Sequence, residues 1–398
     1  MKSSLRRGIA VFAFSTLCIG AAFVCRRHAP MPFVWAYAFF GIGVSALLFM
    51  AKSDIIKYTG IIILSLFLAL SGGEFFLSPS PQTNDAGETL PSFRKFSENG
   101  KGTIWTTKDP LTGYRGKSSA HVRAHSVQEG QTIYDVVYST NKDGWRAMPQ
   151  HDGARIAVVF FGCSYTFGEA LDDEDTFAIK LSGLLGPEYQ VFNFGFSGFG
   201  SHQFLALLES GVLAPITSNY EKVHIFYLSL AGHELRSGGY SDWDTWGPWY
   251  EEENGRAVHK GNFADREGRF RSAMNYFFRK SHVYSLLFNQ ARATEAEGPL
   301  RQLQAVIIQT AAEKIAGYEN TDFTLLSWPG NEAIAKDMEA CAVNVTPLAP
   351  ALPGYENDAA QYQIKGDGHP NARANSLVAD FLADIIHELD QPAAAPLE

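Results

Sequence analysis

Residue types that acyl-transfer chemistry needs occur in short polar segments far apart in the sequence. The first segment is the turn "GCSYTFG", in which Ser164 directly follows the apolar run "RIAVVFF". A serine hydroxyl is a weak nucleophile at neutral pH and needs a base within hydrogen-bond reach. It also needs N–H donors at the place where negative charge develops on the carbonyl oxygen. Because turns favour Gly and Ser, a purely structural serine is the alternative interpretation of this segment.

Three later segments could supply the partners of Ser164. The block "NFGFSGFGS" contains Gly198, which allows the backbone to approach a substrate closely. The segment "LAGHELR" offers His233 as a donor and Arg236 as an anchor for an anionic or sugar group. The alternatives are a structural polar residue for His233 and a surface ion pair for Arg236.

The third segment, "KGDGHPNAR", lies near the C-terminus and contains an acid and a base. His369 could take the proton of Ser164, and Asp367 could orient the imidazole. Each residue also has a structural interpretation. His369 precedes Pro370 and Asn371, which suit the start of a helix, and Asp367 could be a turn residue or a helix cap.

Strands and helices that alternate from residue 155 onward would position these segments. Fully apolar strands between amphipathic helices indicate an α/β fold with a parallel sheet that is covered by helices on both faces. Ligands bind such sheets at the carboxyl ends of the strands, where Ser164 is expected. The expected strands cover 155–162, 189–195, 222–230 and 322–329, and the expected helices cover 175–186, 201–212, 300–318, 331–343 and 375–389.

Over residues 155–389 this set of segments resembles the SGNH/GDSL hydrolase superfamily. The resemblance implies a flavodoxin-like parallel sheet and a Ser164–His369–Asp367 triad, with an oxyanion hole formed by Ser164, Gly198 and His233. The chain departs from the family pattern at three places. "GCS" stands where G-D-S is usual, "AGHE" replaces G-x-N-D, and "DGHP" has one residue fewer between acid and base than D-x-x-H. The similarity is to a divergent, membrane-anchored branch.

The first 77 residues contain three apolar stretches, at about 8–25, 31–50 and 58–77. Each approaches the roughly 20 apolar residues that cross a bilayer as a helix, so three transmembrane helices are expected. A signal peptide followed by two spans is the alternative. Loops on the cytoplasmic side of a membrane carry an excess of Lys and Arg. If the N-terminus is cytoplasmic, two such residues lie outside (Arg26, Arg27) and five lie inside (Lys2, Arg6, Arg7, Lys52, Lys57). This balance predicts a catalytic domain on the periplasmic side of the inner membrane.

The soluble part divides by composition. Residues 78–100 are rich in Pro, Ser, Asn and Gly and are expected to be a linker, and 101–150 form a small β-rich lead-in. Residues 151–398 form the hydrolase-like domain, with an insertion at about 237–285. The insertion contains Trp243, Trp246 and Trp249, which suit an aromatic mini-core or, alternatively, a lid or carbohydrate-facing wall.

Charge and cysteine content exclude other classes of function. The net charge of −9 argues against a nucleic-acid surface. The histidines are scattered and the soluble cysteines Cys163 and Cys341 are far apart, so no metal site, cofactor or disulfide framework is expected. The acidic run at 172–175 is interpreted as a solvated helix start rather than a metal site.

The sequence therefore predicts a membrane-anchored serine esterase or O-acyltransferase that forms an acyl-serine intermediate. An acylated envelope glycan is the expected substrate, with a lipid ester second. The alternative is a non-catalytic module that binds a glycan or a protein partner. The oligomeric state leaves no mark in the sequence.

Overall fold

The structure is a computed structural model, and it describes residues 32–49, 53–77, 93–241, 243–267, 281, 283 and 290–391. The expected apolar segment 8–25 and residues 78–92 of the expected linker lie outside the described residues. The chain divides into two compact units. One comprises Met1–Pro81 and Ala273–Glu295, and the other comprises Gln82–Ser272 and Ala296–Glu398.

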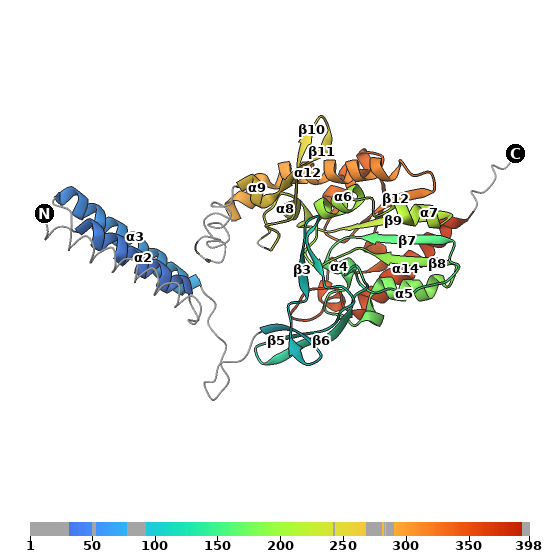
Figure 1. The fold of residues 1–398 in the computed structure, drawn as a ribbon, viewed down its shortest axis with the longest axis horizontal. Coiled ribbons are helices and arrows are strands. Elements are labelled where there is room, and N and C mark those ends of the chain that lie inside the picture. Colours follow the sequence, from blue (N-terminus) through green and yellow to red (C-terminus); the bar gives the residue numbers. More distant parts are fainter. Residues whose placement is uncertain are drawn as a thin grey trace. The chain divides into compact units, whose positions relative to one another are not determined.

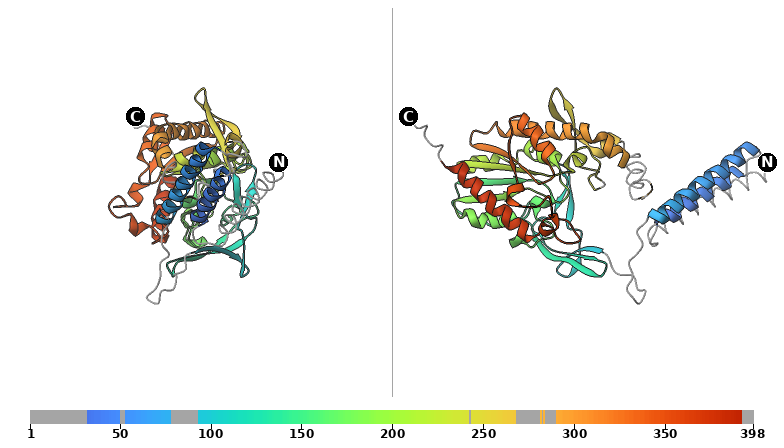
Figure 2. Two further views of the ribbon diagram at one scale, coloured as in Figure 1. Left: turned by 90° about the vertical axis from the view of Figure 1, so that its left-hand side faces the viewer. Right: turned by 180° about the vertical axis from the view of Figure 1, so that it is seen from behind.

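The first unit contains the helices α2 (Pro32–Phe49) and α3 (Asp54–Leu77), which lie side by side in Figures 1 and 2. The Ser45 hydroxyl donates to the carbonyl of Gly60 over 2.8 Å, and this bond joins the two helices. Among the described residues, one helix segment, Asp54–Glu74 of α3, is long and apolar enough to cross a membrane. α2 contains a shorter apolar stretch, Tyr37–Leu48.

A five-stranded parallel sheet forms the centre of the second unit. Its spatial order is β13-β12-β9-β7-β8, the flavodoxin-like order that follows when β7 is taken as the first strand. The strand β7 (Ile156–Phe161) consists of β-branched and aromatic residues and one alanine, almost all of them buried, as a central parallel strand requires. The other strands are β8 (Tyr189–Asn193), β9 (Lys222–Ser229), β12 (Thr321–Ser327) and β13 (Asn344–Pro347).

Helices cover both faces of this sheet because successive side chains of each strand point to opposite sides (Figure 1). Val158 and Phe160 of β7 pack in one core with α5 (Phe177–Leu185) and α14 (Ala372–Asp390). Val159 and Phe161 pack in the other core with α6 (Ser201–Glu209) and α12 (Gln290–Ile315). The view from behind in Figure 2 shows α14, in red, along its length. The expected α/β fold with a parallel sheet is confirmed.

The β-rich lead-in begins earlier than expected. Strand β1 (Phe93–Glu98) lies within the segment expected to be a linker, and it pairs with β5 (His121–Gln128) in an antiparallel sheet of order β2-β1-β5-β6. The remaining strands of the lead-in are β2 (Lys101–Gly102), β6 (Gln131–Ser139) and the hairpin of β3 (Thr106–Asp109) and β4 (Gly113–Gly116).

The acidic run at 172–175 fastens this lead-in to the sheet domain, so it is more than a solvated helix start. Asp172 accepts a 2.7 Å hydrogen bond from the N–H of Val137 on β6. Asp173 accepts from the N–H of Ser139 and pairs with the fully buried guanidinium of Arg146 at 2.8 Å. The carboxylates of Asp172 and Asp173 are thus hydrogen-bonded or paired within the protein. No cluster of potential metal ligands occurs among the described residues.

The remaining elements are short. The insertion contains an antiparallel hairpin of β10 (Pro248–Glu253) and β11 (Arg256–Asn262), which its Trp and Gly content did not predict. The short helices are α4 (Ser164–Phe167), α7 (Ala214–Asn219), α8 (His233–Ser237), α9 (Phe263–Glu267) and α13 (Glu332–Ala340), with 3-10 turns at Asp173–Asp175, Ala349–Ala351 and Ala359–Tyr362.

Candidate active site

Ser164 lies on a tight turn that follows β7. Gly162 begins the turn with φ of 154°, and a Cβ at that position would come within 2.1 Å of the Thr166 hydroxyl oxygen, so a glycine is required. Cys163 is extended and fully buried, and Ser164 is the first residue of the single helical turn α4. The first N–H groups of a helix have no acceptor within it. The N–H of Ser164 accordingly has no acceptor within the described part of the chain.

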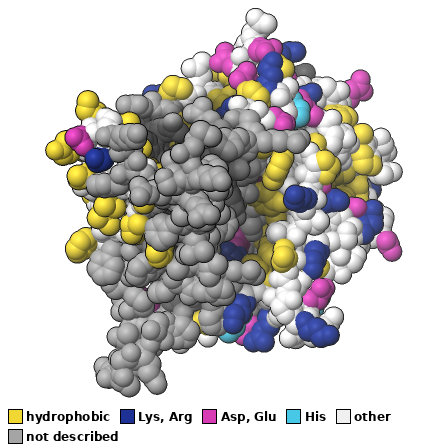
Figure 3. Space-filling model, turned by 60° about the vertical axis from the view of Figure 1, so that its left-hand side comes forward, with side chains coloured by type: hydrophobic (Ala, Val, Ile, Leu, Met, Phe, Trp, Pro, Cys, Tyr) yellow, Lys and Arg dark blue, Asp and Glu magenta, His cyan; other side chains and the backbone are white. Residues whose placement is uncertain are grey.

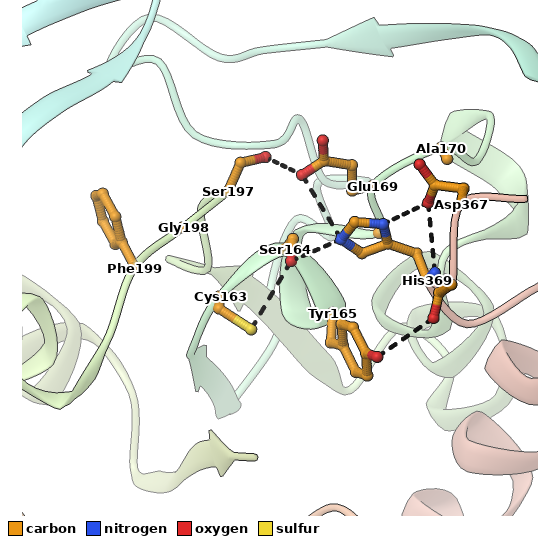
Figure 4. A network of polar contacts seen from close by, with 12 residues as sticks. Cys163, Ser164, Tyr165, Glu169, Ala170, Ser197, Gly198, Phe199, Asp367 and His369 are labelled. Atoms are coloured by element: carbon orange, nitrogen blue, oxygen red, sulfur yellow. Dashed lines mark hydrogen bonds and ion pairs between the residues drawn. The ribbon is translucent and has the colours of Figure 1, made fainter. Parts of the chain in front are cut away.

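A second turn brings Asp367 and His369 to Ser164 (Figure 4). Gly366 and Gly368 have φ of 85° and 91°, and the N–H of Gly368 bonds back to the carbonyl of Ile364 at 3.0 Å. This tight turn folds the Asp367 carboxylate onto the ring of His369, two residues later, where it accepts a bond from Nδ1. One residue fewer between acid and base therefore still lets the two side chains meet.

The other ring nitrogen of His369, Nε2, lies 2.9 Å from the Oγ of Ser164. An ionised carboxylate only accepts hydrogen bonds, so Nδ1 carries the ring proton and Nε2 is left to accept from the serine hydroxyl. This arrangement of acid, imidazole and hydroxyl can withdraw the proton of Ser164 as its oxygen attacks.

The pKa of Asp367 lies below its usual value. Burial alone would raise this pKa, but the hydrogen bond from the His369 ring, the bond from the His369 N–H and the nearby Arg94 together outweigh it. The carboxylate is therefore ionised at neutral pH, as an acid that orients an imidazole must be.

Tyr165 and Asn371 hold the turn of Asp367 and His369 in place. The Tyr165 hydroxyl donates to the carbonyl of Gly368 over 3.3 Å, and its ring packs edge-on against the His369 ring. Asn371 caps α14 by accepting a bond from the N–H of Ala374 at 3.0 Å. The base is thus fixed between the nucleophile turn and the start of the last helix.

The loop after β8 carries Gly198. Asn193 joins this loop to the nucleophile turn, since its side-chain amide donates to the carbonyl of Thr166 and accepts from the N–H of Gly195. Gly198 has φ of 80°, and within the described residues its own N–H has no acceptor. Ser164 and Gly198 line the same cavity, so the two N–H groups expected to hold an oxyanion lie in one site.

Glu169 also lies at this site, and no pattern in the sequence indicated it. Its carboxylate, 4% exposed, accepts hydrogen bonds from Arg94 of β1 and from the Ser197 hydroxyl. One of its oxygens is 4.0 Å from the Nε2 of His369 (Figure 4). The sequence did not indicate this contact, because Glu169 is a single acidic residue in a turn and Arg94 lies in a segment expected to be a linker.

The cavity around Ser164 has a volume of about 720 Å³. Segments far apart in the chain line it. The lead-in contributes seven residues (Arg94, Ile104, Thr106, Thr107, Lys108, Gly113, Tyr114), and the insertion contributes two (Trp243, Trp246). Trp243 is 58% exposed and Trp246 is 50% exposed, so these two rings do not form a mini-core. They form part of the wall of the cavity instead.

Arg236 lines this cavity, but His233 does not. His233 is completely buried, and its Nδ1 is 2.7 Å from the Tyr227 hydroxyl. Burial lowers the pKa of the ring well below its usual value, and the charge of Arg236 adds to this effect. The expected role of His233 at the oxyanion stays a prediction, since its Nε2 has no hydrogen-bond partner among the described residues. Arg236 donates to the carbonyl of Phe199 at 2.8 Å, which fixes its guanidinium at the edge of the cavity.

Comparisons with known proteins find similarity at the level of structure only. No protein-family model matches the chain, and neither does any curated protein sequence. The similar solved structures include a lipolytic protein of the G-D-S-L family from Veillonella parvula, with 11% identity, 58% of this chain and 98% of that chain covered, and a TM-score of 0.34. Another is the inhibitor-bound aryl esterase of M. smegmatis, which is 13% identical and has a TM-score of 0.34. The match covers 59% of this chain and 100% of that chain.

A third is Est24, a carbohydrate acetylesterase from Sinorhizobium meliloti, which is 13% identical and has a TM-score of 0.30. The match covers 59% of this chain and 100% of that chain. The similarity to these three structures is one of fold. The residues of this chain that bear on its activity include Ser164, Gly198 and His369, which lie at the ends of elements of the parallel sheet domain.

Proposed function

We propose that the protein is a membrane-anchored serine esterase that forms an acyl-Ser164 intermediate. One observation carries the proposal: the hydrogen bonds that run from Asp367 through His369 to the Oγ of Ser164. A structural turn serine needs no such partners. Because Cys163 is fully buried beside Ser164, the serine is the nucleophile that the cavity exposes to an ester.

In the first half of the reaction, the Oγ of Ser164 attacks the carbonyl carbon of the ester and its proton passes to Nε2 of His369. The negative charge that develops on the carbonyl oxygen is held by the N–H groups of Ser164 and Gly198. The bond between the carbonyl carbon and the leaving oxygen then breaks, and His369 returns the proton to that oxygen. Asp367 holds the ring and stabilises the imidazolium between these two transfers.

In the second half, an acceptor hydroxyl gives its proton to His369 while its oxygen attacks the acyl carbon. The acyl–Ser164 bond breaks, and the serine oxygen takes the proton back. If the acceptor is water, the ester is hydrolysed, whereas a sugar hydroxyl would make the protein an O-acyltransferase. The same residues serve both outcomes, and hydrolysis is the reaction proposed here.

An O-acyl ester of an envelope glycan, such as an acetyl ester, suits the cavity best. The exposed faces of Trp243 and Trp246 offer apolar surfaces for a sugar ring, with Arg236 and Lys108 as donors to its hydroxyl or anionic groups. Lys108 lies 5.6 Å from the centre of the Trp246 ring. A lipid ester is the second choice, because charged side chains line the cavity together with the aromatic rings.

Three N-terminal spans are proposed to anchor the protein, with the N-terminus inside and residues 78–398 on the periplasmic side. The apolar length of α3 supports one span, and the balance of Lys and Arg supports the orientation. Dark blue basic and magenta acidic side chains both occur on the described part of the face drawn in Figure 3. Reporter fusions after residue 78 test the orientation, because alkaline phosphatase is active only outside the cytoplasm.

A fluorophosphonate probe, which reacts covalently with activated serines, tests the enzyme. The full chain in detergent micelles should be labelled, and Ser164→Ala should abolish both labelling and the hydrolysis of p-nitrophenyl acetate. Ser197→Ala removes another serine of the same cavity and should keep the label. A folded wild-type protein that neither reacts with the probe nor hydrolyses the ester would instead be a binding module.

A further inference from the structure

The loop that carries Gly198 is held by side chains from three different parts of the chain. Three consecutive backbone carbonyls, at residues 197, 198 and 199, each accept one side-chain hydrogen bond. The donors are Tyr114 from the lead-in at 2.8 Å, Trp243 from the insertion at 3.2 Å and Arg236 from α8 at 2.8 Å.

The bond from Tyr114 has a specific consequence for Gly198. The carbonyl of Ser197 and the N–H of Gly198 belong to the same peptide group, which is planar and trans. In such a group the C=O and the N–H point in opposite directions. Fixing the direction of the Ser197 carbonyl therefore also fixes the direction of the Gly198 N–H.

A peptide beside a glycine needs such a restraint. Gly198 has φ of 80°, and glycine changes backbone conformation at low cost because it has no Cβ. The next N–H along the loop, that of Phe199, is already bonded to the carbonyl of Phe196 at 3.1 Å. The N–H of Gly198 has no acceptor among the described residues, so within this pair it is the one available to a ligand.

We propose that Tyr114 is a positioning residue that holds the N–H of Gly198 in the direction needed to stabilise the oxyanion. This role rests on the proposed function, since it serves the reaction at Ser164. Burial raises the pKa of the Tyr114 hydroxyl well above its usual value, so the phenol stays protonated and remains a donor over the whole working range of pH. A residue of the lead-in thereby acts on the chemistry of the sheet domain.

The test uses Tyr114→Phe in the full chain in detergent micelles, with p-nitrophenyl acetate as substrate. The end-point of fluorophosphonate labelling counts folded, reactive sites, so kcat can be given per site even if part of the sample unfolds. We expect kcat per site to fall about tenfold with KM within about twofold. Removing an oxyanion donor itself costs on the order of 10²–10³-fold, and a donor that is only less well oriented should cost less.

One control separates this role from general stabilisation. Tyr250→Phe removes a buried hydroxyl bond of 2.6 Å to Glu209, outside the cavity, and should leave kcat unchanged.

A transition-state analogue gives a second readout. A trifluoromethyl ketone that adds to Ser164 forms an oxyanion, and its affinity should weaken in Tyr114→Phe by the same factor as kcat. If wild type shows Ser164-dependent hydrolysis but Tyr114→Phe matches it in kcat and analogue affinity, the positioning role is wrong while the esterase stands. If wild type shows no Ser164-dependent reaction, the proposed function fails and this role fails with it.

Discussion

The carboxylate of Asp367 and the imidazole of His369 are hydrogen-bonded although only Gly368 separates them in the chain. The positive φ of Gly368 and of Gly366 makes this contact possible, because the turn they form folds the carboxylate back onto the ring. Acid and base therefore belong to one turn, which is fastened to the nucleophile by the bond from Tyr165 to the Gly368 carbonyl.

Asp367→Asn should lower kcat strongly and leave KM almost unchanged. An amide can present its NH₂ group to Nδ1, and the ring then adopts the tautomer that cannot accept the serine proton. Loss of the acid in a serine triad costs up to about 10⁴-fold. Steady-state hydrolysis of p-nitrophenyl acetate measures the change. Asp384→Asn, on the exposed side of α14, is the matched control, and an Asp367→Asn enzyme as active as this control would contradict the assigned role.

The ionisation of Asp367 should also make stability depend on pH in the acid range. Its folded-state pKa lies below the unfolded value of about 3.9, so the ionised carboxylate stabilises the fold above that pH. This contribution is lost as the pH falls through the folded pKa. The difference in unfolding temperature between wild type and Asp367→Asn should therefore be largest near neutral pH and shrink below about pH 4. A difference that stays constant from pH 7 to pH 3 would argue against a carboxylate stabilised in this way.

Gly198→Ala should damage the oxyanion loop. A Cβ at this position would lie 2.4 Å from the Trp243 Nε1 and 2.6 Å from the Tyr114 hydroxyl, and the backbone has a positive φ. The loop has to shift, so we expect kcat to fall on the order of 10²-fold, as for loss of an oxyanion donor. Gly183→Ala is the control, since nothing lies within 4 Å of its added Cβ on α5. Equal activity of the two variants would exclude Gly198 from the oxyanion site.

Glu169→Gln tests the second carboxylate of the cavity. The variant keeps the shape of the side chain but removes the charge that pairs with Arg94. We expect a lower unfolding temperature and a several-fold lower kcat, because Ser197, next to Gly198, loses its charged acceptor. Arg94→Gln supplies the other half of a double-mutant cycle. Because Glu169 and Arg94 interact, the loss of unfolding free energy in the double variant should be smaller than the sum of the losses in the two single variants. Losses that simply add would contradict the interaction.

Trp243 and Trp246 should matter for a glycan but not for a small ester. Replacing either with alanine removes an exposed aromatic surface of the cavity, so KM for an acetylated oligosaccharide should rise severalfold. KM for p-nitrophenyl acetate should change by less than about twofold. Trp249→Ala is the comparison, because Trp249 lies on β10 and does not line the cavity. If the substitutions change KM for both substrates by the same factor, the two tryptophans do not bind sugars.

The sequence predicted the α/β sheet well because buried parallel strands such as Ile156–Phe161 have a distinctive composition. The sequence predicted strands less well where their conformation depends on pairing with residues far away in the chain. Strand β1 was missed because its residues "FRKFSE" are mostly polar and gain their strand conformation by pairing with β5. The edge strand β13 has four residues, too few to show a period.

The candidate site shows the same division. Ser164, Gly198 and the segment with Asp367 and His369 follow ends of regular elements, so local patterns indicated them. Glu169 and Tyr114 could not be found in this way, since both reach the site through contacts with distant parts of the chain. His233 was indicated by its place in the motif, which suggests a donor to the oxyanion. The structure pairs its Nδ1 with the Tyr227 hydroxyl in the core, a contact that no local pattern indicated.

The lead-in has a practical meaning for anyone who isolates or recombines this domain. Arg94 and Tyr114 precede residue 151, where a trimmed hydrolase core would naturally begin, yet both line the cavity of Ser164. A fragment that starts at residue 151 would keep the nucleophile, the acid and the base but have an open cleft without one of its walls. Exchanging residues 93–150 between relatives would, by the same reasoning, transplant substrate preference without touching the triad.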